Sequence, residues 1–168
     1  MEVRVKDNSA IFKNAKDQAV AAALEAVGLT AERHAKENCP VDTGLLRNSI
    51  THAISGQPPA ISEYKASFSE EKSKKGKRYS TRAKNADSLT FRSGKYSGNA
   101  PDDPKNKKAV YIGTNVVYAQ RQEINDSYVH TTGQAHFLRD AAATHGDEYK
   151  RIMETQLRKA GTGGDVTI

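Results

Sequence analysis

The sequence has one cysteine, Cys39, and no tryptophan. A single cysteine excludes a disulfide within the chain and any metal site built from several cysteines. No apolar run approaches the roughly 20 residues that a membrane-spanning helix needs, and the first five residues lack the apolar segment of a signal peptide. We therefore expect no membrane contact and synthesis in a reducing cytoplasm, with Cys39 as a small apolar core residue.

Signatures of nucleotide binding and catalysis are also missing. The chain contains neither the GxxxxGK[ST] nor the GxGxxG pattern of phosphate-binding loops. It has no HExxH zinc motif among its histidines, which are His34, His52, His130, His136 and His145. No Ser-His-Asp or paired-carboxylate arrangement stands out. The sequence therefore predicts a protein that is not an enzyme and that holds no cofactor or metal.

Length and charge give the next constraints. A chain of 168 residues can form one domain, 1–168, and bury about two-thirds of its unfolded surface. Only 36% of the residues are hydrophobic, so we expect a modest core that contacts between subunits supplement. Residues 65–108 hold thirteen Lys and Arg against five Asp and Glu, a net charge of +8, while the whole chain is +6. The remainder therefore carries −2, and the basic character belongs to this one segment.

The N-terminal part is typical of an amphipathic helix over residues 11–38. Its less polar positions recur at spacings of three and four; they are Phe12, Ala15, Ala19, Ala22, Ala23, Ala26, Val27, Thr30 and His34. Most are alanine, so this helix can approach its partner closely while burying little area per residue. Gly28 should weaken it locally, and His34 is expected to be a buried or interface histidine.

Alternating patterns predict strands further along the chain. Apolar and polar residues alternate over 46–54, over 60–68 as a partner strand, and over 110–116 with a bend at Gly113. A turn or short helix is expected at 118–123 and a brief edge strand at 127–130. After Gly133, helical spacing predicts a C-terminal helix that starts near Leu138 and continues past Met153. Together these elements predict an α+β fold, with a small antiparallel sheet packed against long N- and C-terminal helices.

A sharp corner separates the N-terminal helix from the first strand. Pro40 cannot continue a helix, Asp42 and Thr43 form hydrogen bonds with nearby backbone, and Gly44 permits positive φ. Pro40, Asp42, Thr43 and Gly44 are therefore predicted to be structural. Asp-Thr-Gly is also the active-site triplet of aspartic proteases, but there it ends an apolar strand, and here it follows a proline and precedes Leu45.

Three stretches carry a family resemblance. The first runs from Pro40 through Asp42-Thr43-Gly44 to Ile50 behind an Ala-rich helix, the second is 111–119 followed by Glu123, and the third is 135–141. In this order they resemble a family of minor structural proteins of long-tailed bacteriophages, the head–tail joining or tail-completion proteins of the neck. The resemblance covers roughly residues 12–56 and 109–157, and it leaves the segment between them unexplained.

That segment, 69–108, is predicted to be a basic extended loop or hairpin arm inserted in the domain. Short alternating pieces around Tyr79 and around Phe91 favour the hairpin. We expect contacts outside its own subunit to order it. The candidate contact residues are basic; they are Lys72, Lys74, Lys75, Lys77, Arg78, Arg82, Lys84, Arg92 and Lys95. Such a surface fits either an acidic protein neighbour or DNA, because cations release counterions from phosphates and aromatic rings stack on bases.

The resemblance implies a structural role as a virion protein. The subunit would form a ring with copies of itself, with sixfold symmetry as our expectation, and would join or complete the head–tail interface. Adjacent neck and tail proteins, and the DNA passing through the channel, would be its partners, first in the host cytoplasm and then in the virion. A second interpretation is a DNA-binding accessory protein that acts through the arm 69–108. A third is an aspartic protease that uses Asp42.

Overall fold

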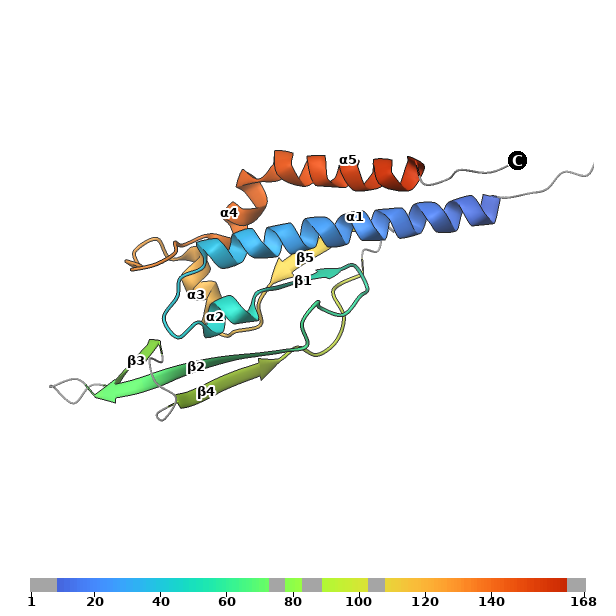
Figure 1. The fold of residues 1–168 in the computed structure, drawn as a ribbon. Coiled ribbons are helices and arrows are strands. Elements are labelled where there is room, and N and C mark those ends of the chain that lie inside the picture. Colours follow the sequence, from blue (N-terminus) through green and yellow to red (C-terminus); the bar gives the residue numbers. More distant parts are fainter. Residues whose placement is uncertain (1–8, 73–77, 83–88, 103–107, 163–168) are drawn as a thin grey trace, which may run out of the picture.

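The computed structural model describes residues 9–72, 78–82, 89–102 and 108–162, and their fold is α+β as predicted (Figure 1). The helices are α1 (Ser9–Asn38), α2 (Leu45–Ser49), α3 (Ala119–Ile124), α4 (Phe137–Thr144) and α5 (Gly146–Thr162). The strands are β1 (Thr51–Ile54), β2 (Glu63–Lys72), β3 (Arg78–Arg82), β4 (Leu89–Lys95) and β5 (Val110–Gly113). They form two antiparallel sheets, one of β1 and β5 and the other in the order β3-β2-β4.

Helix α1 lies between two layers. Helices α4 and α5 pack along one side of it, and the β1–β5 sheet packs on the other (Figure 1). Its buried apolar residues lie in the C-terminal two-thirds of the helix; they are Ala23, Leu24, Val27, Ala31 and Ala35. The predicted stripe is therefore wrong at its start, since Phe12 is 74% exposed. The reason is length, because the first turns of α1 extend beyond the sheet that could cover them.

The predicted strand over 46–54 is half wrong. Residues Leu45–Ser49 form helix α2, and only Thr51–Ile54 form a strand. Leu46 and Ile50 fit both patterns, because residues four apart share one face of a helix as well as one face of a strand. Both side chains are buried in the core.

The second sheet also differs from expectation. Strand β2 exists, but it pairs with β4 and β3 rather than with β1, and β3 and β4 flank β2 instead of pairing with each other. Strand β5 does pair with β1, in a register that places Ile54 opposite Val110. Residues 127–130 contain no strand, and the C-terminal helix is broken at His145 into α4 and α5.

The corner after α1 begins helix α2. Gly44 has φ 84° and ψ −2°, a left-handed conformation, and its carbonyl accepts a hydrogen bond of 2.9 Å from the N–H of Asn48. Leu45 N–H donates to Thr43 Oγ1 at 3.3 Å. A glycine is favoured here because residues with a Cβ rarely adopt this conformation.

Replacing Gly44 by valine tests this corner. A Cβ at Gly44 would meet no atom within 4 Å, so any cost comes from the backbone conformation alone. We expect a loss of about 1–3 kcal/mol in the free energy of unfolding, measured with urea. The matched control is Gly146→Ala, a site equally open but without positive φ, which should be neutral or slightly stabilising. Equal stability of Gly44→Val and the parent would contradict this account of the corner.

Candidate functional site

The three stretches that carry the resemblance meet in one core. Its buried members come from α1, α2, α3, α4 and the residues directly after α1 and α2; they are Ala35, Cys39, Leu46, Ile50, Ala119, Phe137 and Ala141. Cys39 is buried, and this burial raises the pKa of its thiol to about 12, so it serves as an apolar residue rather than as a nucleophile. Residues 40–50, 111–123 and 135–141 thus form one structural unit.

The loop before α4 lies directly against the corner. Gly133 has φ 75°, and a Cβ there would lie 2.4 Å from the carbonyl carbon of Cys39. Next to it, the N–H of Gln134 donates to the carbonyl of Asn38 at 2.9 Å, and the hydroxyl of Thr132 donates to the carbonyl of Val41 at 3.1 Å. The close approach and the conformation both require glycine at position 133.

Glu123 fixes the start of α4. Its two carboxylate oxygens accept hydrogen bonds from the N–H groups of Leu138 and Arg139, both at 3.0 Å. Its own carbonyl accepts from the N–H of His136 at 2.9 Å. A carboxylate at a helix N-terminus satisfies free N–H groups and complements the helix dipole. Sequence reasoning found Glu123 but not this role, because nothing local shows which helix it caps.

A surface cavity of about 360 Å³ opens at the corner. It is lined by Pro40, Asp42, Thr43, Gly44, Leu45, Leu46, Arg92, Tyr118, Gln122 and His130. All four predicted corner residues line this cavity together with Arg92 of the basic segment. Burial raises the pKa of the Tyr118 hydroxyl, which also lines it. Aspartic protease chemistry needs two facing carboxylates. Among the described residues that line this cavity, Asp42 is the one carboxylate.

Hydrogen bonds to the rest of the subunit hold the part of the basic segment where β2 begins and β4 ends. Asn48 of α2 donates to the carbonyl of Lys65 at 2.9 Å, and the hydroxyl of Tyr96 donates to the carbonyl of Ser49. Asn115 links β2 to β4. Its side-chain oxygen accepts a hydrogen bond from the Tyr64 hydroxyl at 2.5 Å, and its side-chain nitrogen donates one to the Lys95 carbonyl at 2.8 Å. Within the segment 69–108, Lys95 and Tyr96 are therefore held by their own subunit, and the expectation that outside contacts order the rest of the segment stays a prediction.

The predicted basic residues divide into three groups. Lys95 pairs with Glu63 at 2.6 Å across the β2–β4 ladder, where both side chains are exposed, and Arg92 lines the corner cavity. Lys72, Arg78 and Arg82 lie on β2 and β3, where Lys72 is the register partner of Arg78. Lys74, Lys75, Lys77 and Lys84 lie outside the described residues.

A buried ion cluster joins α1 to β1. His52 is 1% exposed, and its ring lies over Gly28, where a Cβ would come within 2.4 Å of the ring atom Cδ2. Its Nδ1 lies 2.6 Å from Glu32 Oε2, and its Nε2 lies 3.1 Å from Glu25 Oε1. Glu32 also accepts from the His52 backbone N–H at 3.1 Å and pairs with Lys36. These partners are complete, which indicates that the cluster is structural.

The cluster shifts the pKa of both groups. The hydrogen bond with Glu32 raises the pKa of His52 above its ordinary 6.5, although burial opposes it. Burial alone would raise the pKa of Glu32, but hydrogen bonds from His52 and Lys36 outweigh it and hold this pKa below 4.5. Both shifts favour the charged forms, an imidazolium and a carboxylate, over the neutral forms.

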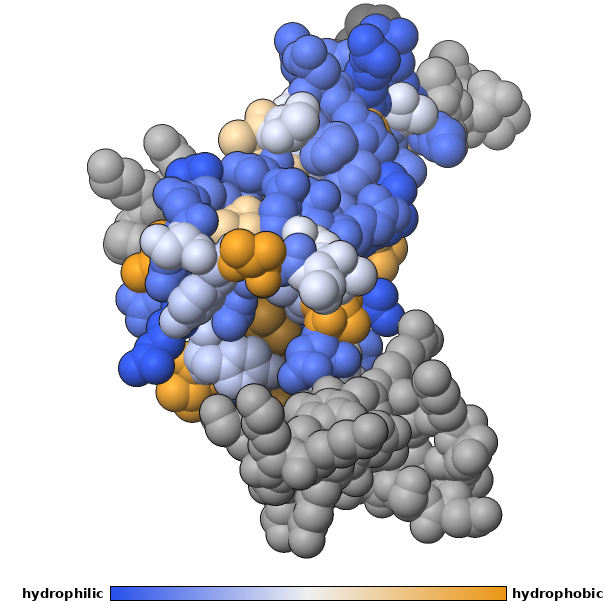
Figure 2. Space-filling model, turned by 90° about the vertical axis from the view of Figure 1, so that its left-hand side faces the viewer, coloured by the Kyte–Doolittle hydropathy of each residue, from blue (hydrophilic) through white to orange (hydrophobic). Residues whose placement is uncertain are grey.

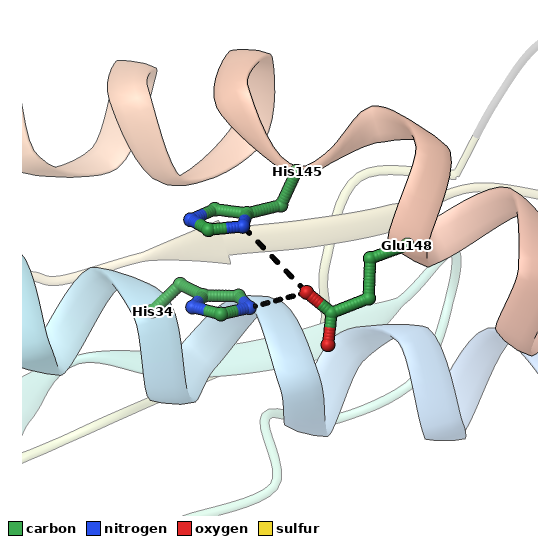
Figure 3. A group of neighbouring side chains, drawn as sticks. All are labelled: His34, His145 and Glu148. Atoms are coloured by element: carbon green, nitrogen blue, oxygen red, sulfur yellow. Dashed lines mark hydrogen bonds and ion pairs between the residues drawn. The ribbon is translucent and has the colours of Figure 1, made fainter.

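A second histidine group lies on the other side of α1. His34, His145 and Glu148 come together from α1, from the break between α4 and α5, and from the first turn of α5 (Figure 3). Their ligand atoms lie within 4.8 Å of one another, so in the described part of the chain these three residues could hold a metal ion. The prediction that the histidines form no metal motif relied on local spacing, and His34 lies 114 residues from Glu148.

Comparison with known proteins assigns this chain to no family. No family model, no curated protein and no solved structure matches this chain. Within the described residues, no helix is both long and apolar enough to cross a membrane.

The ion cluster predicts a dependence of stability on pH. Because the pKa of His52 is raised on folding, its contribution is complete below pH 6.5 and is lost as pH rises through the raised value. Glu32 contributes above pH 4.5, and its contribution is lost as pH falls through the lowered value. We expect the stability difference between the parent and His52→Gln to shrink as pH rises from about 6 to 9 in urea unfolding.

The comparison of two proteins at each pH cancels the titrating groups that do not contact His52. Lys95→Gln is the control, because it removes an exposed ion pair and should alter stability little. A difference between parent and His52→Gln that stays constant over this range would show that His52 is not charged in the native state.

Proposed function

We propose that this protein is a structural protein of the neck of a long-tailed bacteriophage, a ring subunit that joins or completes the head–tail interface. The resemblance in residues 40–50, 111–123 and 135–141 suggests the family. Support comes from the way these stretches pack together, since Leu46 and Ile50 share one buried core with Ala119 and Phe137, and Glu123 caps α4 beside it. The resemblance therefore lies in residues that build the body of the subunit.

The observation that carries the proposal is the placement of exposed apolar side chains at opposite ends of the molecule. The first turn of α1 exposes Ile11 and Phe12, which we call the α1-end group. The residues around α3 expose Val117, Ile124, Tyr128 and Val129, which we call the loop-end group; Val129 is 97% exposed. Figure 1 places α3 far from the start of α1, and Figure 2 views the α3 end, where hydrophobic residues are exposed among hydrophilic ones.

Two different apolar surfaces suit a ring. In a head-to-tail interface one surface of a subunit contacts a different surface of the next, and repetition closes a ring when the rotation fits. Exposed apolar groups are common singly, but their gathering at two ends favours interfaces. The ring that we propose pairs the α1-end group of each subunit with the loop-end group of its neighbour. Sixfold symmetry, contact with adjacent neck and tail proteins, and location in the virion are parts of the same proposal.

A complementation experiment tests this pairing. We expect Phe12→Glu and Val129→Glu each to remain monomeric in light scattering after size-exclusion chromatography, because each lacks one half of the interface. Mixed in equal amounts, they should form dimers and nothing larger, because only one intact pairing is available between them. The parent should form a closed ring.

Leu29→Glu is the matched control, since Leu29 is an exposed apolar residue of α1 that belongs to neither group, and this variant should assemble like the parent. A monomeric parent, or assembly of both single variants into rings, would refute the proposed interface. The two monomeric variants, Phe12→Glu and Val129→Glu, should unfold cooperatively at similar melting temperatures, which shows that neither substitution unfolds the subunit.

The second candidate function is DNA binding through the basic segment. The observation that favours it is the net charge of +8 over residues 65–108, with Lys72 directly opposite Arg78. In the neck proposal the same segment meets either an acidic neighbour or the DNA in the channel. The two proposals differ in whether the isolated protein retains DNA.

The register of β2 and β4 allows this segment to be shortened cleanly. Ser69 and Leu89 are register partners, so an Asn-Gly turn can replace residues 70–88 and close a two-residue hairpin. This change removes seven basic and three acidic residues. If the segment binds DNA, the parent should retain duplex DNA with an affinity that falls steeply with salt, and the shortened protein should lose most of this slope.

The melting temperature of the shortened protein should stay close to that of the parent, because the contacts of Asn48, Tyr64 and Tyr96 remain. Equal DNA retention by the two proteins would rule out residues 70–88 as the DNA-binding part. Absence of DNA binding in both would leave the acidic neighbour as the partner of this segment.

A further inference from the structure

The break between α4 and α5 places two histidine rings face to face. His145, at the break, stacks on His34 of α1 with ring centroids 3.6 Å apart and planes 3° from parallel. Glu148 extends from α5 toward both rings (Figure 3). Its Oε2 lies 2.9 Å from His34 Nε2 and 3.6 Å from His145 Nδ1. Two imidazole nitrogens and one carboxylate oxygen thus converge on one spot from elements far apart in the sequence.

We propose that His34, His145 and Glu148 bind a divalent transition-metal ion, with Zn²⁺ as the best fit. Two imidazoles and a carboxylate form a donor set that zinc favours, with a fourth position for water or another ligand. Tetrahedral zinc with bonds of about 2.0–2.2 Å places its ligand atoms about 3.3 Å apart. The donor atoms lie within 4.8 Å of one another, so small side-chain rotations bring them to that spacing.

The surroundings support a cation at this place. Glu37 Oε2 lies 3.6 Å from Nδ1 of His34, the nitrogen that faces away from Glu148. A carboxylate beside the second nitrogen of a ligating histidine orients the ring and raises its basicity. Arg33 Nη2 lies 3.6 Å from the other oxygen of Glu148, Oε1, and 3.4 Å from His34 Nε2, so a bound ion would displace this guanidinium from the ring nitrogen while Oε2 stays directed at the rings. The carboxylates of Glu37 and Glu148 and the guanidinium of Arg33 give a net charge of −1 around the two rings, which attracts a cation.

The site also has a rigid half and a movable half. His34 is 8% exposed and lies in the middle layer of the fold, so its position is fixed. The lone pairs of parallel rings run side by side, so one ring must tilt before both nitrogens bond to one ion. His145 can do so, because its side chain is 31% exposed and it lies between two helices rather than within one. A bound ion would then tie α1 to the C-terminal helices.

The test uses the full chain with any affinity tag removed. We expect calorimetry to show one equivalent of Zn²⁺ bound, Co²⁺ to give visible absorption typical of nitrogen and oxygen ligands, and Zn²⁺ to raise the melting temperature. His145→Gln and Glu148→Gln should each weaken Zn²⁺ binding at least about tenfold. Both positions are partly exposed, so these variants should fold, and their melting temperatures without metal check that they do.

His136→Gln is the matched control. His136 also pairs with a carboxylate, Asp126 at 2.7 Å, but in a histidine–acid pair outside the group of Figure 3. It should bind Zn²⁺ like the parent. A parent that binds no Zn²⁺ would overturn the proposal, and so would Zn²⁺ binding that persists unchanged in His145→Gln and Glu148→Gln. Neither result would bear on the ring, whose interfaces lie at the two ends of the molecule.

Discussion

The fold depends on how His52 sits against α1. Glu25, Gly28 and Glu32 recur at spacings that place them on one face of the helix, and together they surround one imidazole ring. Glycine lets the helix approach β1 closely, and the two glutamates neutralise a charge that would otherwise be costly to bury. Glycine at position 28 was expected to weaken α1, but the same residue is what allows α1 to pack on the sheet. Because β1 pairs with β5, this contact also positions the chain that leads into α3.

A second set of contacts closes the end of the molecule where the corner lies. Gly133 approaches the backbone of Cys39, Glu123 caps α4, and Phe137 fills the core between them. Each contact joins segments that are distant in sequence, and each uses a residue type that few others can replace. This explains in physical terms why residues from three separate stretches act as one unit. It also leaves Asp42 at the surface cavity that opens at the corner.

The two sheets belong to different parts of the molecule. The β1–β5 sheet belongs to the body and packs on α1, whereas the β3-β2-β4 sheet contacts α2 and lies largely within the basic segment 65–108. Its attachment uses side-chain hydrogen bonds from Asn48, Tyr64 and Tyr96 rather than a large apolar core. Such an arrangement lets the charge of the segment change without altering the body. It agrees with the proposal that the body forms a ring while the segment meets an anionic partner.

The sequence by itself determined the α+β class, the extent of α1, the corner at Pro40–Gly44 and the basic segment. These depend on local causes: helical periodicity, the absent N–H of proline, the φ range of glycine and the local excess of charge. Tertiary structure alone decided that 45–49 is a helix, that β2 pairs with β4, and which residues meet Glu123 and His34. The 3.6- and 2-residue periods coincide over a few residues, so Leu46 and Ile50 could not distinguish helix from strand. Strand partners, helix caps and the group of His34, His145 and Glu148 depend on contacts between distant segments, which local spacing does not encode.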